Sequence, residues 1–194
     1  MIRIGIFSGT FSPPHNGHVA AARAFMEQMW LDYLYVLPSR EDAQSHIDGM
    51  HRLQMCRLAF AGLDGVCVSD MRLSQATDIA DVARALQGDE RRLFLLCGTD
   101  ELLSLDLRSD AEELFRLCYP TYVRRESDPL LDARIVEKIS QYHKTYGKVV
   151  RRIVTEPIQI SSHAVRDRIA AGKTVGDLIP ASVEKYIADN HLYG

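Results

Sequence analysis

Two histidines in a short loop near the N-terminus are the residues of this sequence best suited to chemistry on a phosphate. They belong to the stretch GTFSPPHNGH, which covers 9–18 and places His15 and His18 three positions apart. Imidazole groups donate hydrogen bonds to phosphate oxygens and can carry positive charge where negative charge builds up. Gly9 and Gly17 let the backbone approach a ligand without a side chain in the way. We therefore predict a phosphate site around His15 and His18.

The segments on either side predict the elements that position these histidines. An apolar run over 3–7 predicts a buried strand, and an apolar stripe over 17–30 predicts a helix. Pro13 and Pro14 keep the loop out of helical geometry until Asn16, which is a good N-cap residue. The free N–H groups and the dipole of a helix N-terminus favour an anion, so the predicted elements suit the predicted chemistry.

Two other interpretations of the histidine pair stay open at this point. A loop histidine is most often a solvated or capping residue, and the His-x-x-His spacing is also that of half a metal site. Neither explains why strand, glycine, twin proline, paired histidine and helix follow in this order. The sequence shows no clustered carboxylates that would indicate a dedicated metal site, so no protein metal ligand is predicted.

The rest of the chain predicts alternating strands and helices. The predicted strands cover 31–37, 66–68, 92–97, 119–123 and 149–154, and the predicted helices cover 50–61, 79–86, 109–117, 129–146, 164–171 and 180–190. Pro120 predicts that its strand lies near a sheet edge. Such alternation is typical of an α/β fold with a doubly wound parallel sheet, in which ligands bind at the carboxyl ends of the strands, where strand order reverses.

Composition narrows the class of protein. The 194 residues, of which 46% are hydrophobic and 25% charged, predict one soluble domain over 1–194. The formal net charge of -3 argues against a protein that binds nucleic acid. No apolar run is long enough to span a bilayer, and no signal peptide is recognised at the N-terminus. The sequence leaves open whether the chain forms a homo-oligomer.

The cysteines predict a reducing compartment. The four of them are widely spaced and form no Cys-x-x-Cys pair. Cys67, Cys97 and Cys118 fall in or beside predicted strands, where a buried and reduced thiol is expected. A cytoplasmic location is therefore predicted.

Two later segments place polar residues directly after strands. Gly98 and Asp100 follow the fourth predicted strand, and Ser161, Ser162 and Arg166 follow the last one, at the start of a helix. The N–H, O–H and guanidinium groups of the second segment could grip a phosphate. A capped helix with a surface arginine and a strand-end turn with an ordinary aspartate are the competing interpretations.

These motifs resemble a known family. The stretch over 9–18 resembles the signature of the nucleotidyltransferase superfamily that carries a His-x-Gly-His motif, in the form found in bacterial nicotinate-nucleotide adenylyltransferases. The segment over 160–166 resembles the family's Ile-Ser-Ser-Thr-x-Ile-Arg, with His163 in place of Thr, and 178–193 resembles the family's ending. Ser12 stands where the family usually has Asp, at a position that varies across the superfamily. The likeness covers essentially the whole chain and implies a Rossmann-like nucleotidyltransferase fold.

The resemblance also implies a reaction and a set of site residues. The AMP moiety of ATP would be joined to nicotinate mononucleotide in NAD biosynthesis, with release of pyrophosphate and with Mg²⁺ carried by the ATP phosphates. An acceptor phosphate is already ionised at neutral pH, so catalysis would rest on positioning and charge neutralisation. His18, with His15 beside it, is the predicted catalytic residue at the α-phosphate. The predicted contacts to the ATP phosphates are Gly9, Thr10, Phe11, Ser161, Ser162 and Arg166, and those to the ribose are Gly98 and Asp100.

The acceptor half of the predicted site departs from the family. Arg108 stands where the family has a Trp that stacks on the pyridine, and 40–46 lacks the family's Pro-Pro-His-Lys. Thr77 and Asp81 are the remaining counterparts of a third family feature, a Ser-Tyr-Thr-x-Asp-Thr helix start. Arg108, Thr77 and Asp81 are the predicted acceptor-binding residues, since a guanidinium can stack on a ring or pair with a carboxylate. A surface position in a drifted loop is the other interpretation of Arg108.

Three other functions stay open on the sequence alone. A related nucleotidyltransferase would use another phosphorylated acceptor, such as nicotinamide mononucleotide or phosphopantetheine. A nucleotide-binding regulatory protein on the same fold would bind ATP without releasing pyrophosphate. A metal-binding module would take up zinc tightly through His15 and His18.

Overall fold

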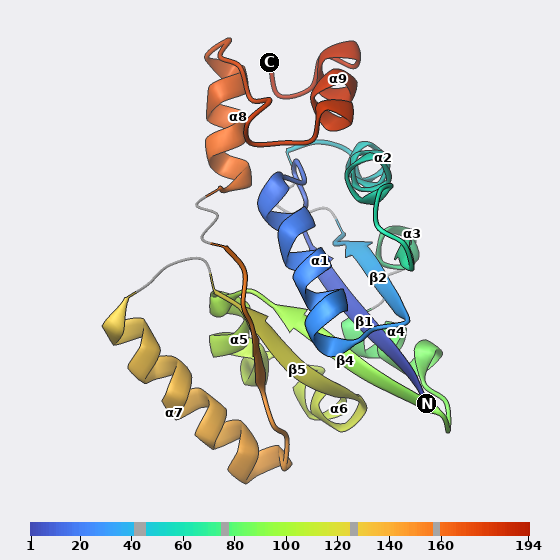
Figure 1. Ribbon diagram of the computed structural model, residues 1–194, viewed down its shortest axis with the longest axis vertical. Helices are drawn as coiled ribbons and strands as arrows, with labels where there is room; N and C mark the ends of the chain where they lie inside the picture. The colour runs from blue at the N-terminus through green and yellow to red at the C-terminus, as the bar shows by residue number, and fades with distance from the viewer. Residues whose placement is uncertain (41–45, 75–77, 125–127, 157–159) are drawn as a thin grey trace.

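A six-stranded parallel sheet forms the centre of the structure (Figure 1). The structure is a computed structural model that describes residues 1–40, 46–74, 78–124, 128–156 and 160–194. The strands are β1 (Ile2–Gly9), β2 (Tyr33–Pro38), β3 (Val66–Val68), β4 (Arg91–Cys97), β5 (Cys118–Val123) and β6 (Arg151–Ile153). Their order is β3-β2-β1-β4-β5-β6, and neighbouring strands pair in parallel. The order reverses between β1 and β4, where folds of this kind bind ligands.

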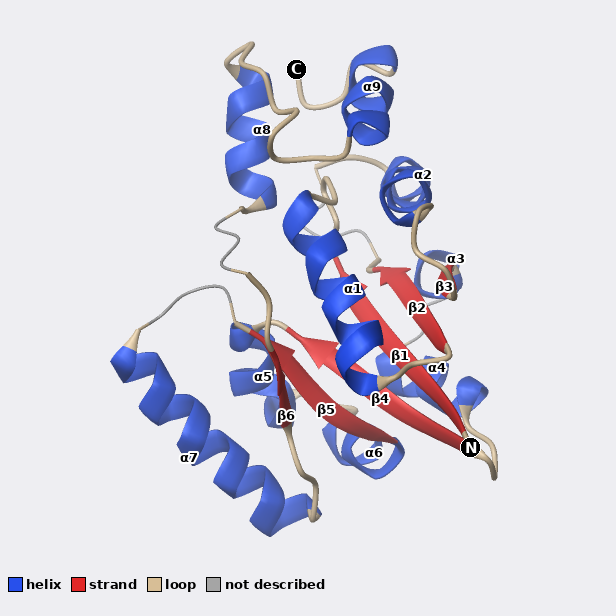
Figure 2. Cartoon of the chain, viewed as in Figure 1, coloured by secondary structure: helices blue, strands red, loops and turns tan. Residues whose placement is uncertain are grey.

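Helices cover both faces of the sheet (Figure 2). They are α1 (Asn16–Met29), α2 (Gly49–Phe60), α3 (Met71–Ser74), α4 (Ile79–Leu86), α5 (Thr99–Ser104), α6 (Ala111–Leu117), α7 (Pro129–Tyr146), α8 (Ser162–Ala170) and α9 (Ala181–Asp189), with a short 3₁₀ helix η1 (Leu105–Leu107). One apolar core joins α1, α2, α8 and α9 to the sheet, and a second joins α4, α5, α6 and α7 to the other face. The predicted doubly wound parallel α/β fold is therefore confirmed.

Strand β1 lies between the two cores and packs closely against α1 at Gly5. Ile4 and Ile6 pack into one core and Phe7 into the other, which is the alternation of a strand buried on both faces. At Gly5 a Cβ atom would lie 2.5 Å from Leu31 Cδ1 and 2.8 Å from Phe25 Cε1. Glycine therefore allows α1 and the turn after it to pack directly on β1.

The predicted helices and strands agree with the structure, except that two short helices were not predicted. The helices predicted over 79–86 and 129–146 coincide with α4 and α7. Helices α3 and α5 were not predicted, because four and six residues are too few to show a helical period. Among the helices of the described ranges, none has the length and apolarity needed to cross a membrane.

The strand that contains Pro120 lies near a sheet edge, as predicted. β5 lies between β4 and β6, so it is the neighbour of the edge strand β6. The pairing of β5 with β6 begins at Thr121, one residue after Pro120, so the missing N–H of the proline falls outside that ladder. On the β4 side, the Thr121 hydroxyl donates a hydrogen bond to Leu95 O at 2.9 Å.

One cysteine also differs from its prediction. Cys97 and Cys118 are buried as expected, but Cys67 is exposed. It lies in β3, a three-residue strand at the other edge of the sheet, whose side chains are only partly covered. All four cysteines are free thiols.

Candidate active site

A pocket of about 610 Å³ lies at the carboxyl ends of β1, β4 and β5. Its walls come from segments far apart in the chain: the loop after β1 with the start of α1, the turn into α5, the end of β5, and the start of α8. The described lining includes the predicted site residues Gly9, Thr10, Phe11, His15, His18, Gly98, Asp100, Ser162 and Arg166. The fold thus places the predicted phosphate loop, ribose segment and C-terminal segment around one space.

The two histidines cap α1 and hold each other in place. His15, rather than the predicted Asn16, is the N-cap residue, and the two imidazoles stack with ring centroids 3.6 Å apart. His18 N donates to His15 Nδ1 at 3.3 Å, and His15 N donates to His18 Nδ1 at 3.2 Å. Because both Nδ1 atoms accept backbone hydrogen bonds, the donor atom of each neutral ring is Nε2. The reciprocal cap therefore fixes the tautomer and the orientation of both rings at a helix N-terminus.

Phe11 anchors the loop that precedes the histidines. Its side chain is 2% exposed, and its ring packs edge-on against His18 at 5.0 Å and against Phe7 at 5.2 Å between centroids. Its φ of 49° is in the left-handed region, which a bulky residue rarely adopts unless packing holds it there. Phe11 was predicted to contact phosphate, and the structure shows that its ring packs edge-on against the His18 ring.

Buried Arg52 holds the same loop from α2. Its side chain is completely buried, and its Nη1 donates to Thr10 O at 2.8 Å and to Ser39 O at 2.9 Å. The contact joins the loop after β1 to the end of β2. Sequence reasoning missed Arg52, because an arginine within a helical pattern is typical of a solvent-facing position.

The C-terminal segment binds the loop through Ser162 and Arg166. Ser162 Oγ donates to Pro13 O at 2.8 Å, and Arg166 Nη1 donates to Ser12 O at 2.7 Å. Ser161 is exposed and caps α8, its hydroxyl accepting from Ala164 N at 3.1 Å. Ser162 and Arg166 line the pocket, whereas Ser161 is not among the described lining residues.

The turn after β4 places acidic side chains in the wall of the pocket. Gly98 is the N-cap residue of α5, and Thr99, Asp100 and Glu101 line the pocket. Burial raises the pKa of Glu101 to about 7, against the opposing effects of Arg108 and the backbone N–H of Gly98. Sequence reasoning missed Glu101, although its position one residue after Asp100 at a strand end was a usable signal.

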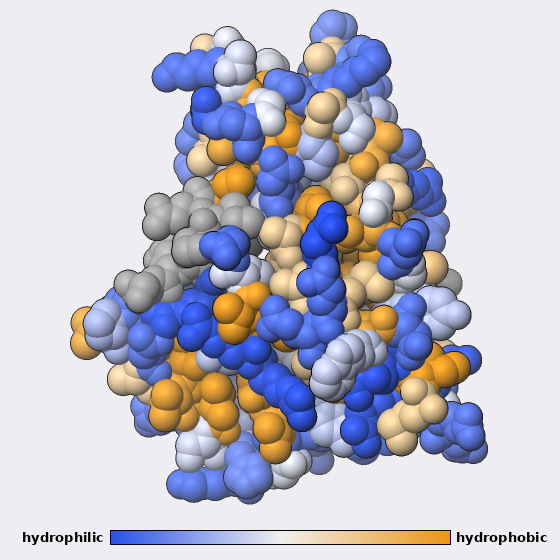
Figure 3. Space-filling view, viewed as in Figure 1, coloured by the Kyte–Doolittle hydropathy of each residue, from blue (hydrophilic) through white to orange (hydrophobic). Residues whose placement is uncertain are grey.

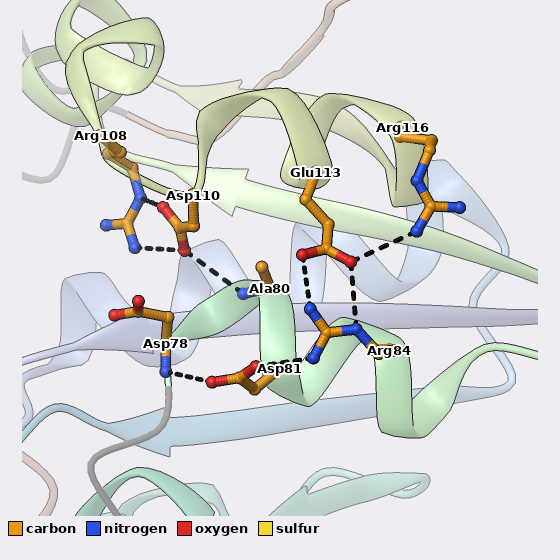
Figure 4. A network of polar contacts seen from close by, with 8 residues as sticks. All are labelled: Asp78, Ala80, Asp81, Arg84, Arg108, Asp110, Glu113 and Arg116. Carbon is orange, nitrogen blue, oxygen red and sulfur yellow. Dashed lines mark hydrogen bonds and ion pairs between the residues drawn. The ribbon is translucent and has the colours of Figure 1, made fainter.

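Two of the predicted acceptor residues, Arg108 and Asp81, lie in a network of polar contacts (Figure 4). Arg108 Nε donates to Asp110 Oδ1 at 2.7 Å and Nη2 donates to Oδ2 at 2.9 Å. Asp81 accepts from Asp78 N at 3.0 Å and pairs with Arg84 at 2.7 Å at the start of α4. Neither Arg108 nor Asp81 is among the described residues that line the pocket. Thr77 lies outside the described residues.

Arg124 is a further cation that sequence reasoning missed. It follows β5 directly and lines the pocket, and its side chain is 6% exposed. It forms an ion pair with Asp132, and its Nη2 donates to Asp128 O at 2.9 Å, both at the start of α7. Its Nε has no hydrogen-bond partner among the described residues. The signal that could have found it is its place at a strand's carboxyl end.

Comparison with known proteins identifies the family. A family model described as cytidylyltransferase-like matches residues 6–168. The chain belongs to the cytidylyltransferase-like family. Two relatives, each called "Probable nicotinate-nucleotide adenylyltransferase", come from Pseudomonas aeruginosa and from Thermoanaerobacter sp. (strain X514). The first is 32% identical over 98% of this chain and 97% of the relative, and the second is 28% identical over 99% and 94%.

A solved structure has the same fold. The structure of Plasmodium falciparum nicotinic acid mononucleotide adenylyltransferase complexed with NaAD superposes with a TM-score of 0.74 and 16% identity, over 100% of this chain and 98% of that one. At this identity the likeness shows the fold alone. The six-stranded sheet is that of the Rossmann-like nucleotidyltransferase fold.

Proposed function

We propose that this protein is a nicotinate-nucleotide adenylyltransferase, which joins the AMP moiety of ATP to nicotinate mononucleotide and releases pyrophosphate in NAD biosynthesis. Full-length similarity to relatives of that name supports the proposal. The observation that carries it is the stacked pair His15 and His18, oriented by a reciprocal cap at the N-terminus of α1 and facing a pocket of about 610 Å³. The proposal treats 1–194 as one nucleotidyltransferase domain.

The geometry suits an in-line attack that needs no protein nucleophile. The acceptor phosphate oxygen forms a bond to the α-phosphorus of ATP as the bond to the pyrophosphate oxygen breaks. His18 Nε2 would donate to a non-bridging α-phosphate oxygen and stabilise the charge that develops there, with His15 stacked behind it. The backbone of Gly9 and Thr10, together with Ser162 and Arg166, would surround the β- and γ-phosphates.

The residues present suit a magnesium ion that arrives with the nucleotide. Within the described part of the chain, no group of three or more His, Cys, Asp and Glu residues could hold a metal. Asp100 and Glu101 are the carboxylates of the described pocket lining, and oxygen is the donor that Mg²⁺ prefers. Bound to the phosphates, Mg²⁺ would neutralise part of their charge while keeping most of its water ligands.

The acceptor is tested by measuring pyrophosphate release from Mg-ATP with four parallel additions: nicotinate mononucleotide, nicotinamide mononucleotide, phosphopantetheine and no acceptor. Preference for nicotinate mononucleotide, and its loss in His18→Ala, is the expected result. Pyrophosphate release that is equal with every addition, or that survives His18→Ala unchanged, would contradict the proposal.

A second candidate, a nucleotidyltransferase with another phosphorylated acceptor, is favoured by one observation. The family's stacking Trp is replaced by Arg108, whose guanidinium is bound to Asp110, and the single tryptophan of the chain, Trp30, directly follows the C-terminal end of α1. The same panel separates the two candidates. We also propose a cytoplasmic location, which the four free thiols support because unpaired cysteines persist in reducing compartments.

A further inference from the structure

A second pocket lies at the opposite end of the same strands. It measures about 220 Å³ and is lined by β1, β4, β5 and β6 beside the last turn of α1. Gln28, which precedes the lining residue Met29, joins α1 to the residue after β6, since its Nε2 donates to Val154 O at 2.7 Å and its Oε1 accepts from Val154 N at 3.0 Å. The arginines and aromatic residues that line this pocket are Arg3, Arg92, Arg151, Phe94 and Tyr119.

Cations in this pocket lie over aromatic rings. The guanidinium carbon of Arg3 is 4.6 Å from the centroid of Phe94, and that of Arg92 is 5.3 Å from the centroid of Tyr119. Lys148 Nζ lies 4.3 Å from the centroid of Tyr119. A guanidinium that stacks on a ring can still donate from its N–H edge, and such an edge matches the two oxygens of a phosphate. In Arg3 the Nε already donates to Met29 O at 2.6 Å, so the Nη groups are the donors that it can offer to a ligand.

The positive charge here is balanced only in part by a nearby carboxylate. Asp32 Oδ2 accepts from Arg3 N at 2.7 Å, but among the residues that the structure describes no ion pair joins Arg3, Arg92 or Arg151 to an acidic side chain. Burial lowers the pKa of Arg3, and the charges of Arg92 and Arg151 lower it further, against the smaller opposing effect of Asp32. Three guanidinium groups thus repel one another in a chain whose net charge is -3, and an anion between them would relieve the repulsion.

Figure 3 shows strongly hydrophilic side chains gathered over the lower part of this face, between α1 and α7. Pockets that bind drug-sized ligands measure about 300–1,000 Å³, so this pocket is suited to a smaller ligand. We propose that the pocket around Arg3, Arg92 and Arg151 is a second anion-binding site, which takes a phosphate-type oxyanion of about the size of pyrophosphate. The oxyanion is either free or the phosphate part of a nucleotide whose remainder stays outside.

Trp30 provides a reporter for this site. It directly follows Met29, which lines the pocket, its side chain is 75% exposed, and it is the only tryptophan of the chain. Helix α1 has 14 residues and rises about 1.5 Å for each, so Trp30 is about 20 Å from the histidines. Its fluorescence therefore responds to binding beside α1's last turn rather than to binding at the other end of the helix.

The test is a fluorescence titration of the full chain with pyrophosphate and, separately, with ATP. We expect a saturable change that weakens at least about tenfold in Arg92→Gln/Arg151→Gln. The matched control Arg23→Gln/Arg134→Gln removes the same charge from exposed positions on α1 and α7 and should bind within about twofold of wild type. Tighter binding of pyrophosphate than of ATP assigns the free anion, and the reverse assigns the nucleotide.

Two results would overturn the second anion site: no saturable change with either anion, or equal weakening in both double variants. Because all four substituted arginines are exposed, the variants should fold, and circular dichroism with a thermal melt checks this. The readout is binding at a distance from the histidines, so its outcome is independent of whether the protein transfers adenylyl groups.

Discussion

The Tyr193 hydroxyl lies 2.9 Å from the Ser12 hydroxyl, across 181 positions of sequence. Burial raises the pKa of Tyr193, so the hydroxyl stays protonated and can donate this hydrogen bond. Ser12 O also accepts from Arg166, and the neighbouring Pro13 O accepts from Ser162. The loop that presents the histidines is therefore held by side chains that follow β6 as well as by the strand from which it emerges.

We expect Tyr193→Phe to weaken this connection without disturbing the packing of the ring. The lost hydrogen bond should lower the free energy of unfolding by about 1 kcal/mol and raise KM for ATP a few-fold, as the loop gains freedom. Ser12→Ala should do the same, and the double variant should cost less than the sum of the two. Urea unfolding of all four proteins measures this coupling, and strict additivity would show that the two hydroxyls do not interact.

His18→Ala should lower turnover far more than it lowers nucleotide affinity. Loss of one donor that acts on developing charge typically costs about 10²–10³-fold in kcat, whereas ground-state binding is shared among many contacts. Pyrophosphate release and ATP binding by calorimetry give the two quantities. His143→Ala, on exposed α7, is the control. A His18→Ala protein with wild-type kcat would remove this residue from the mechanism.

Arg166→Lys should separate charge from geometry at the phosphate end of the pocket. Lysine retains the positive charge but lacks the planar fork that reaches Ser12 O, so we expect KM for ATP to rise about tenfold. Arg168→Lys changes the same chemistry two residues along α8, in a surface ion pair with Asp177. Comparable kinetics for the two variants would argue that Arg166 does not contact the nucleotide.

Glu101 should make stability depend on pH in a defined direction. Its pKa of about 7 lies above the ordinary value of 4.5, so the folded protein binds more protons than the unfolded chain between these values. The free energy of unfolding therefore falls as pH rises through this window, by about 1–3 kcal/mol from this one group. Chemical unfolding at pH 4.5, 6 and 8 should show a shallower fall for Glu101→Gln than for wild type. Glu112→Gln, at an exposed position, should behave as wild type, and parallel profiles for all three would refute the assignment.

Arg108→Ala tests the predicted acceptor contact against the observed ion pair. The structure binds this guanidinium to Asp110, whose Oδ2 also accepts from Ala80 N at the start of α4 at 3.4 Å. We expect a loss of about 1 kcal/mol in stability for a partly buried bidentate pair and little change in KM for the acceptor. A large rise in acceptor KM at unchanged stability would instead support the acceptor role.

Periodicity predicted the layers of this fold well, because strands and helices report their burial through the spacing of apolar residues. α4 and α7 were found to the residue, and the histidine loop was recognised from the order of its residue types. The supports of that loop were not found. Arg52 lies in a predicted helix, where an arginine is expected to face solvent. Tyr193 contacts Ser12 across 181 positions of sequence, so only the folded geometry shows either contact.

The roles of individual polar groups were also beyond sequence reasoning. Ser161 and Ser162 are adjacent and alike, yet one caps α8 while the other binds Pro13 O, because successive residues at a helix start point in different directions. Pro120 predicted only that its strand lies near an edge, for a related reason. A proline shows that one N–H is missing, but not on which side of the strand a partner is needed.

The connection between residue 12 and residue 193 has a consequence for synthesis on the ribosome. A nascent chain that has emerged only as far as β6 already carries both histidines, but the side chains of α8 and the segment after α9 that hold their loop are still in the exit tunnel. Tight nucleotide binding should therefore be acquired only after Tyr193 has left the tunnel, later than the sheet. A nascent chain that presents only the residues before α8 would release ATP that a chain emerged through Tyr193 retains.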